Sequence, residues 1–173
     1  MAGGEPTRVV VSDSSVLINF INIDRLNLLG ALPGFDFVIP DHVEAEITQP
    51  EQKACLAVAI EAGHLKREAM TDLTEIGVFA ELTQVMGKGE AACLAMAKER
   101  GWWIAADERG RFLRQVRERL GEARLLNTPG ILLKAIRANV LTVAEADKLK
   151  AELERHRFKM KFGSFGELLG MQS

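Results

Sequence analysis

Residues 8–18 of this chain read RVVVSDSSVLI, and we take this stretch to decide the fold. Arg8–Ser12 is a β-branched run that ends at a polar residue, a pattern typical of a strand buried on both faces of a sheet. Asp13 stands at the carboxyl end of that strand, and the apolar residues from Ser15 to Leu32 recur at helical spacing. A buried strand followed by an aspartate and a helix is the beginning of an α/β unit.

The same order returns later in the chain. Residues 102–107 read WWIAAD, which predicts a strand over Trp102–Ala106 with Asp107 at its carboxyl end. The preceding Gly89–Arg100 segment has high helix propensity and ends at Gly101, a favourable residue after a helix. A basic helix is expected from Arg109 to Leu120.

Other elements complete the alternation. Strands are expected at residues 37–39, 64–68 (an edge strand), 124–127 and 158–162 (a short edge strand in the tail), and helices at 51–63, 72–86, 129–138 and 142–155. A further helix should open at Pro40–Asp41, with Asp41 as its N-cap and Glu44 as the partner in a capping box. Alternating strands and helices predict an α/β fold of three layers, with about five parallel strands flanked by helices.

Size and composition indicate one globular domain over residues 1–173. The alternation of strands and helices covers a core at about 8–128, and the remainder, at about 129–173, is expected to be a helical C-terminal extension. The apolar fraction is 47% and the net charge is −2, so any contact with nucleic acid must be local. Cys55 and Cys93 look like core residues of helices in a reducing compartment. Because residues 1–7 lack the pattern of a signal peptide and no apolar run is long enough to span a membrane, we expect a cytoplasmic protein.

Four carboxylates are candidates for one metal site. Asp13 and Asp107 follow buried strands, where parallel sheets bind ligands, while Glu46 and Glu90 lie on helices that can face the same cleft. Clustered carboxylates repel one another unless a hard divalent cation neutralises them, and oxygen ligands favour magnesium or manganese over zinc.

Each of these acids also has a purely structural interpretation. The two aspartates could cap the helices that follow them, and Glu90 could be a favourable charge in the first turn of its helix. Glu44 and Glu46 point to nearly opposite faces of their helix, so only one can join the site. We choose Glu46, because Glu44 has the expected capping role.

These motifs resemble the PIN-domain family. The strand that runs into residues 13–18 (DSSVLI) is similar to the family's opening acidic motif, and Ile39–Pro40 with Glu46–Ile47 is similar to its second. Residues 89–92 (GEAA) resemble the third motif, and residues 104–107 (IAAD) resemble the strand that delivers the fourth acid. Residues 128–169 resemble a prokaryotic subgroup often found beside small antitoxin-like partners.

The resemblance implies a Mg²⁺- or Mn²⁺-dependent endoribonuclease, often the toxin of a toxin–antitoxin pair, with Asp13, Glu46, Glu90 and Asp107 as catalytic metal ligands. A metal-activated water would attack a phosphodiester of RNA. The Ser15 hydroxyl could position water or phosphate, or simply serve a turn.

Local cations are the candidates for RNA binding. Lys88 precedes Glu90, and Arg109 and Arg111 follow Asp107, although a helix would turn only one of these arginines toward the cleft. The residues Arg155, Arg157, Lys159 and Lys161 could bind RNA or an acidic partner, or protect an edge strand.

Three other enzyme classes fit poorly, and one alternative stays open. A haloacid-dehalogenase-like phosphatase needs a second Asp where this chain has Ser15. A response-regulator receiver needs a phosphoacceptor Asp at a later strand and a cooperating Lys, and no such set is visible. Residues 87–89 (GKG) do not form a phosphate loop. The alternative is a catalytically silent PIN-fold module that binds nucleic acid or protein. An apolar helix, Ile131–Ile136, looks exposed and favours a homodimer.

Overall fold

The computed structural model describes residues 6–107 and 110–170, and its centre is a five-stranded sheet in the order β3-β2-β1-β4-β5. The strands are β1 (Arg8–Ser12), β2 (Phe35–Pro40), β3 (Lys66–Glu68), β4 (Trp103–Ala105) and β5 (Leu125–Leu126). Every neighbouring pair is parallel. The expected parallel sheet is therefore confirmed, with β3 at one edge.

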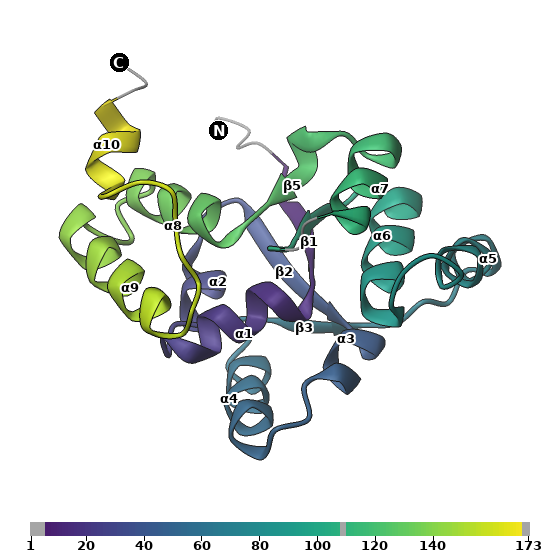
Figure 1. Ribbon diagram of the computed structural model, residues 1–173. Coiled ribbons are helices and arrows are strands. Elements are labelled where there is room, and N and C mark those ends of the chain that lie inside the picture. The colour runs from purple at the N-terminus through teal and green to yellow at the C-terminus, as the bar shows by residue number, and fades with distance from the viewer. Residues whose placement is uncertain (1–5, 108–109, 171–173) are drawn as a thin grey trace.

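Helices cover both faces of this sheet. They are α1 (Ser14–Asn22), α2 (Asn27–Ala31), α3 (Asp41–Glu46), α4 (Pro50–Glu61), α5 (Leu73–Leu82), α6 (Lys88–Arg100), α7 (Arg111–Arg119), α8 (Thr128–Arg137), α9 (Val143–Arg155) and α10 (Phe165–Gly170). Figure 1 shows α5, α6 and α7 on one side of the sheet and α1, α8 and α9 on the other. The fold thus has the three layers that the sequence predicts. Within the described part of the chain, no helix has the length and apolar character needed to cross a membrane.

Helix α6 is the most deeply buried helix of its layer. All residues from Ala91 to Ala97 are fully buried. Its small side chains let it pack against β1 and β4 while α3, α5 and α7 surround it. It ends at Gly101, whose φ of 68° lies in the left-handed region, and Trp102 N donates to Ala97 O at 2.9 Å.

The single helix expected over Ser15–Leu32 is wrong, because the chain turns between α1 and α2. Asp24 adopts a φ of 52°, Asp24 N donates to Ile21 O at 3.0 Å, and Arg25 N donates to Phe20 O at 2.9 Å. These two bonds form a Schellman motif. The sequence concealed it because an aspartate occupies the position that glycine usually marks.

The expected capping box at α3 is also wrong. Asp41 is the first helical residue, Pro40 is the N-cap, and the described residues provide no side-chain cap there. Glu44 instead accepts a hydrogen bond from Arg67 Nε of β3 at 2.8 Å. The reason for preferring Glu46 to Glu44 at the site is therefore wrong, although Glu44 is held by Arg67 instead.

Two expectations about exposure are corrected by the packing. The apolar side of Ile131–Ile136 is buried in the core, with Ile131 and Leu132 fully buried, so the premise for a homodimer falls away. Cys55 is exposed on α4, whereas Cys93 is buried as expected. Helix α4, which carries Cys55, has too little amphipathic contrast for the sequence to assign its buried face.

The expected tail strand is absent from the described residues. Phe158 to Phe162 crosses the molecule without a sheet partner, although the alternation of half-buried Phe158, Met160 and Phe162 with exposed Lys159 and Lys161 is retained. The period of two therefore reflects one face packed on the core, and not a strand.

Candidate active site

Asp13 and Asp107 lie side by side at the point where the strand order reverses. β1 pairs with β2 on one side and with β4 on the other, and the two aspartates follow β1 and β4. Asp13 N donates to Ala105 O at 2.9 Å, which continues the ladder to the sheet edge. This is where an open parallel sheet binds its ligands.

The Ser15 hydroxyl joins the two aspartates. Its Oγ donates to Asp13 Oδ2 at 2.7 Å and accepts from Asp107 N at 3.1 Å. Ser15 N also donates to Asp13 Oδ2 at 3.3 Å, so Asp13 is the N-cap of α1 as well. The structural and functional interpretations of Asp13 are therefore compatible, and Ser15 holds the two aspartates together through its hydroxyl.

Asp107 is held by two residues that the sequence analysis did not single out. Thr128 N donates to Asp107 Oδ1 at 2.8 Å, and the Thr128 hydroxyl makes a short hydrogen bond to Oδ2. Asn19 Nδ2 donates to Oδ2 at 2.8 Å and lies 3.3 Å from Thr128 Oγ1. Two signals were available: Thr128 follows β5 at the same sheet edge, and Asn19 lies one turn after Ser15 on α1.

Glu46 reaches the site from the end of α3. Its Oε1 accepts from Gly89 N at 2.9 Å, and its Oε2 accepts from Ser14 Oγ at 3.2 Å. The carboxylate thus links the first residues of α1 and α6, where partial positive charge favours an anion. This contact requires a residue without a side chain at position 89, because a Cβ there would lie 2.5 Å from Glu46 Oε1.

Glu90 lies in the first turn of α6, as expected, and is half-buried. Cys93 lies one turn along the same helix, and the charges that act on its thiol show that Glu90 lies near the other acids. Burial raises the pKa of the Cys93 thiol well above its usual value, and the Asp13, Glu46 and Glu90 carboxylates raise it further. These three acids therefore act on one buried point.

Burial governs the ionisation of both aspartates. It raises the pKa of Asp13, and the hydrogen bonds from Ser15 oppose it. It also raises the pKa of Asp107, with the Asp13 charge adding to the rise while bonds from Thr128 and Asn19 oppose it. The site thus holds two carboxylates whose charged forms are disfavoured by desolvation.

The donor chemistry fits a hard divalent cation. Among the described residues, Asp13 Oδ1 is buried without a hydrogen-bond partner, and so is Oγ of the preceding residue, Ser12. A buried carboxylate oxygen without a partner is costly unless an ion or water binds it. Within residues 6–107 and 110–170, no three His, Cys, Asp or Glu side chains lie close enough together to enclose a metal ion.

The basic candidates are placed less closely. Lys88 is exposed as the first residue of α6, and exposed Arg111 donates from Nη1 to Val85 O at 3.1 Å. Arg109 lies outside the described residues. In the part of the chain that the structure describes, neither Lys88 nor Arg111 forms an ion pair with Asp13, Glu46 or Asp107.

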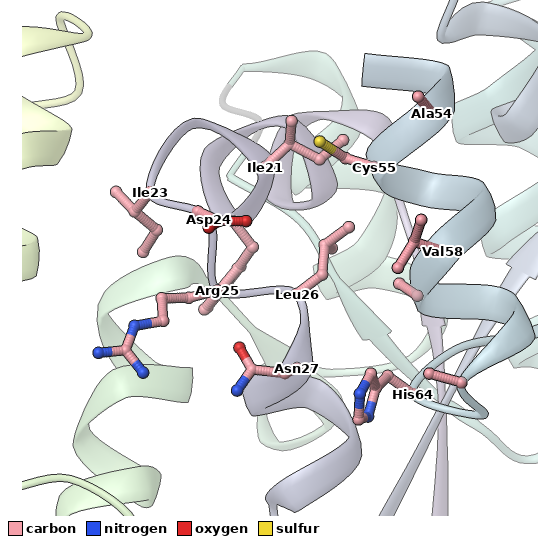
Figure 2. A pocket seen from close by; sticks show the side chains of 13 residues that line it. Ile21, Ile23, Asp24, Arg25, Leu26, Asn27, Ala54, Cys55, Val58 and His64 are labelled. Carbon is pink, nitrogen blue, oxygen red and sulfur yellow. The ribbon is translucent and has the colours of Figure 1, made fainter. Parts of the chain in front are cut away.

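A cavity of about 790 Å³ lies away from the acids, between the turn after α1 and helix α4. Figure 2 shows Cys55 and Val58 of α4 facing Ile21 and Leu26 across it. None of the four acids is among its described lining residues.

Comparison with known proteins identifies a family for this chain. No curated protein matches the chain in sequence. The crystal structure of VapBC2 from Rickettsia felis, bound to a DNA fragment from their promoter, contains a chain that is 13% identical, with a TM-score of 0.48; the match covers 69% of the present chain and 98% of that one. A family model described as a PIN domain matches residues 9–169. This chain therefore belongs to the PIN-domain family.

Proposed function

We propose that this protein is a divalent-metal-dependent nuclease that cleaves phosphodiesters of RNA. The observation that carries the proposal is the pairing of Asp13 with Asp107 at the switch point of the sheet, with one oxygen of Asp13 buried and without a partner among the described residues. Members of the PIN-domain family are generally nucleases. Mg²⁺ or Mn²⁺ suits a site whose ligands are all carboxylate oxygens.

In this proposal Asp13 and Asp107 hold the cation, and Glu46 and Glu90 bind it directly or through water. When bound, the ion lowers the pKa of a water molecule and stabilises charge on the phosphoryl oxygens. The chain's own residues keep the ligands in place: Ser15 fixes both aspartates, and Thr128 and Asn19 favour the ionised form of Asp107. In-line attack of water on the phosphorus breaks the P–O bond of the leaving strand.

The proposal includes a small antitoxin-type protein that restrains the nuclease in the cytoplasm, as the family resemblance suggests. Cells that express this chain alone should stop growing, and co-expression of a small protein encoded next to it should restore growth. Normal growth of cells that accumulate the folded chain alone would contradict the toxin role.

The first test is cleavage of a panel of single-stranded and structured RNAs by purified protein with Mg²⁺, Mn²⁺ or EDTA. Cleavage should require the metal and should be lost in both Asp13→Asn and Asp107→Asn. Equal activity in the variants would indicate a contaminating nuclease. A complete lack of cleavage with any metal would favour the catalytically silent binding module.

Gly89→Ala should separate activity from stability. The new Cβ would displace the Glu46 carboxylate from Gly89 N. We expect cleavage to fall about tenfold or more, as it does in other enzymes when a group that orients a metal ligand is changed. Glu46 is exposed and can move, and alanine is about 1 kcal/mol more favourable than glycine in a helix. Thermal melting should therefore change little. Gly77→Ala on α5, where a Cβ meets nothing within 4 Å, is the matched control.

Thr128→Val should move the pH dependence of cleavage. The Thr128 hydroxyl lowers the pKa of Asp107 against burial, so its removal raises that pKa. Because the metal requires ionised Asp107, the acidic limb of the rate profile should shift to higher pH. At pH values below the shifted limb, activity should fall by about tenfold relative to the wild type. Thr128→Ser retains the hydroxyl and should keep the original profile. An unshifted profile in Thr128→Val would remove Asp107 from the proposed metal ligands.

A further inference from the structure

The segment from Phe158 to Phe162 (FKMKF) is fixed at both ends. At its start, Phe158 N donates to Leu153 O of α9 at 2.9 Å. Beyond its end, the buried Phe165 donates from N to Asp147 Oδ1 at 2.9 Å, and its ring packs edge-on against Phe162 with centroids 4.9 Å apart. Figure 1 shows this connection crossing beside α8 between α9 and α10.

A groove of about 440 Å³ separates this segment from α7, and Asp107 is one of its walls. The other walls include Leu113 and Arg117 of α7, the residues around β5, and the whole Phe158–Phe162 segment. The groove is therefore continuous with the proposed active site through Asp107. Of the cations that the sequence offers for RNA binding, Lys159 and Lys161 line this groove, whereas Lys88 and Arg111 are not among its described walls.

The chemistry of the groove is that of a site for an unpaired nucleic-acid strand. Lys159 and Lys161 are exposed on one wall and Arg117 on the opposite one, which places cations near an acidic centre in a chain of net charge −2. Phe158, half-buried against the core, is an aromatic residue that also lines this space. Cations along a groove bind phosphates, and aromatic rings stack on unpaired bases.

We propose that this groove holds single-stranded RNA next to the phosphodiester that is cleaved. Lys159 and Lys161 contact phosphates, and Phe158 stacks on a base; Phe162 instead packs against Phe165. The inference rests on the proposed nuclease function and adds the RNA-binding surface to it. An acidic protein segment would match the lysines too, but it would bring carboxylates toward Asp107 and would leave the aromatic wall without bases to stack on.

The test measures RNA binding apart from cleavage. Wild-type protein in EDTA is titrated against a labelled single-stranded RNA and a hairpin of the same length, with fluorescence anisotropy at several salt concentrations. The Lys159→Ala/Lys161→Ala double variant should bind the single strand about tenfold more weakly, and its salt slope should fall by about 1.4, the value for two lost phosphate contacts. Phe158→Leu should weaken single-strand binding by about tenfold and hairpin binding much less.

The matched control is Lys53→Ala/Lys148→Ala, which removes two exposed lysines from α4 and α9 outside the groove and should bind as the wild type does. Unchanged affinity and slope in the Lys159/Lys161 variant, or a loss equal to that of the control, would overturn the proposal. Equal wild-type affinity for the hairpin would do so as well. So would tighter wild-type binding of a poly-glutamate peptide than of RNA, lost in the same variant.

Cleavage with Mg²⁺ or Mn²⁺ distinguishes this inference from the proposed function. If the wild type cleaves RNA and the Lys159/Lys161 variant binds and cleaves equally well, the groove proposal fails and the nuclease stands. If the wild type binds the single strand through the groove without cleaving it under any metal, the groove stands and the nuclease fails. If the wild type binds no single-stranded RNA, the groove proposal fails.

Discussion

Asp13→Asn is expected to lower metal-dependent cleavage by about a thousandfold while leaving the protein folded without metal. The loss of activity follows from the loss of a charged ligand at the centre of the proposed site, an effect on the scale of other essential electrostatic contributions. The fold should persist because the asparagine oxygen can still accept from Ser15 N and Ser15 Oγ. Rates with Mg²⁺ and urea unfolding in EDTA measure the two effects.

The same variant should change how stability depends on pH. Burial raises the folded pKa of Asp13 above its ordinary value of 3.8, so the folded state binds more protons than the unfolded state between these two pKa values. The contribution of Asp13 to the free energy of unfolding therefore falls as pH rises through that window. Without metal, Asp13→Asn should lack this fall and be at least as stable as the wild type at neutral pH.

Asp13→Ala is the matched control for the capping role. It removes the acceptor that Ser15 N requires, so it should destabilise the protein by about 1 kcal/mol relative to Asp13→Asn, a usual value for a lost N-cap. A large loss of stability in Asp13→Asn without metal would instead identify Asp13 as a structural residue whose charge the fold needs. That result would also weaken its assignment as the central metal ligand.

Arg100→Ala should produce the largest loss of stability that we predict, about 3 kcal/mol in the free energy of unfolding. Glu75 is 1% exposed, and Arg100 donates to its two oxygens from Nε at 2.7 Å and Nη2 at 2.8 Å. Removal of the arginine leaves a buried carboxylate without its charged partner, which costs about 3–5 kcal/mol in other proteins. We expect the lower end because the Arg100 side chain is 22% exposed.

Two further variants identify the cause. Arg100→Lys keeps the charge but loses the paired donors and the contact over the Trp102 ring at 4.7 Å, so its stability should be intermediate. Adding Glu75→Leu to Arg100→Ala should recover part of the loss, because no buried charge then remains. Urea denaturation of all variants at neutral pH measures these differences. Equal losses in Arg100→Ala and the double variant would show that packing, and not the buried charge, controls stability here.

The local patterns of the sequence predict most of the fold. The β-branched run before Asp13, the second strand before Asp107, and the alanine-rich helix that ends at Gly101 are all confirmed. These patterns are reliable because burial on both faces of a parallel sheet demands apolar strands, and because a glycine after a helix tolerates positive φ. The same reasoning fails at Asp24, where an aspartate takes the conformation usually given to glycine.

Part of the candidate site follows from the sequence and part does not. The sequence places Asp13 and Asp107 at the carboxyl ends of two predicted parallel strands, which lie at one edge of a sheet. That these two strands are neighbours is a finding of the structure. The sequence cannot show that Ser15 joins them or that Asn19 and Thr128 hold Asp107, because these partners are far apart in the chain. Their meeting depends on how α1 and α8 pack over β4 and β5.

The tail shows the same division most clearly. Its alternation of aromatic or methionine residues with lysines is visible in the sequence, and it correctly gives which side chains face the core. Whether such a segment pairs as a strand depends on a free sheet edge beside it, and that is a property of the tertiary structure alone. The sequence by itself therefore determined the parallel α/β core and the placement of Asp13 and Asp107 after two of its strands, because each follows from local patterns of burial. Only the packing of distant segments decided the network around those acids and turned the tail into a wall of the groove beside Asp107.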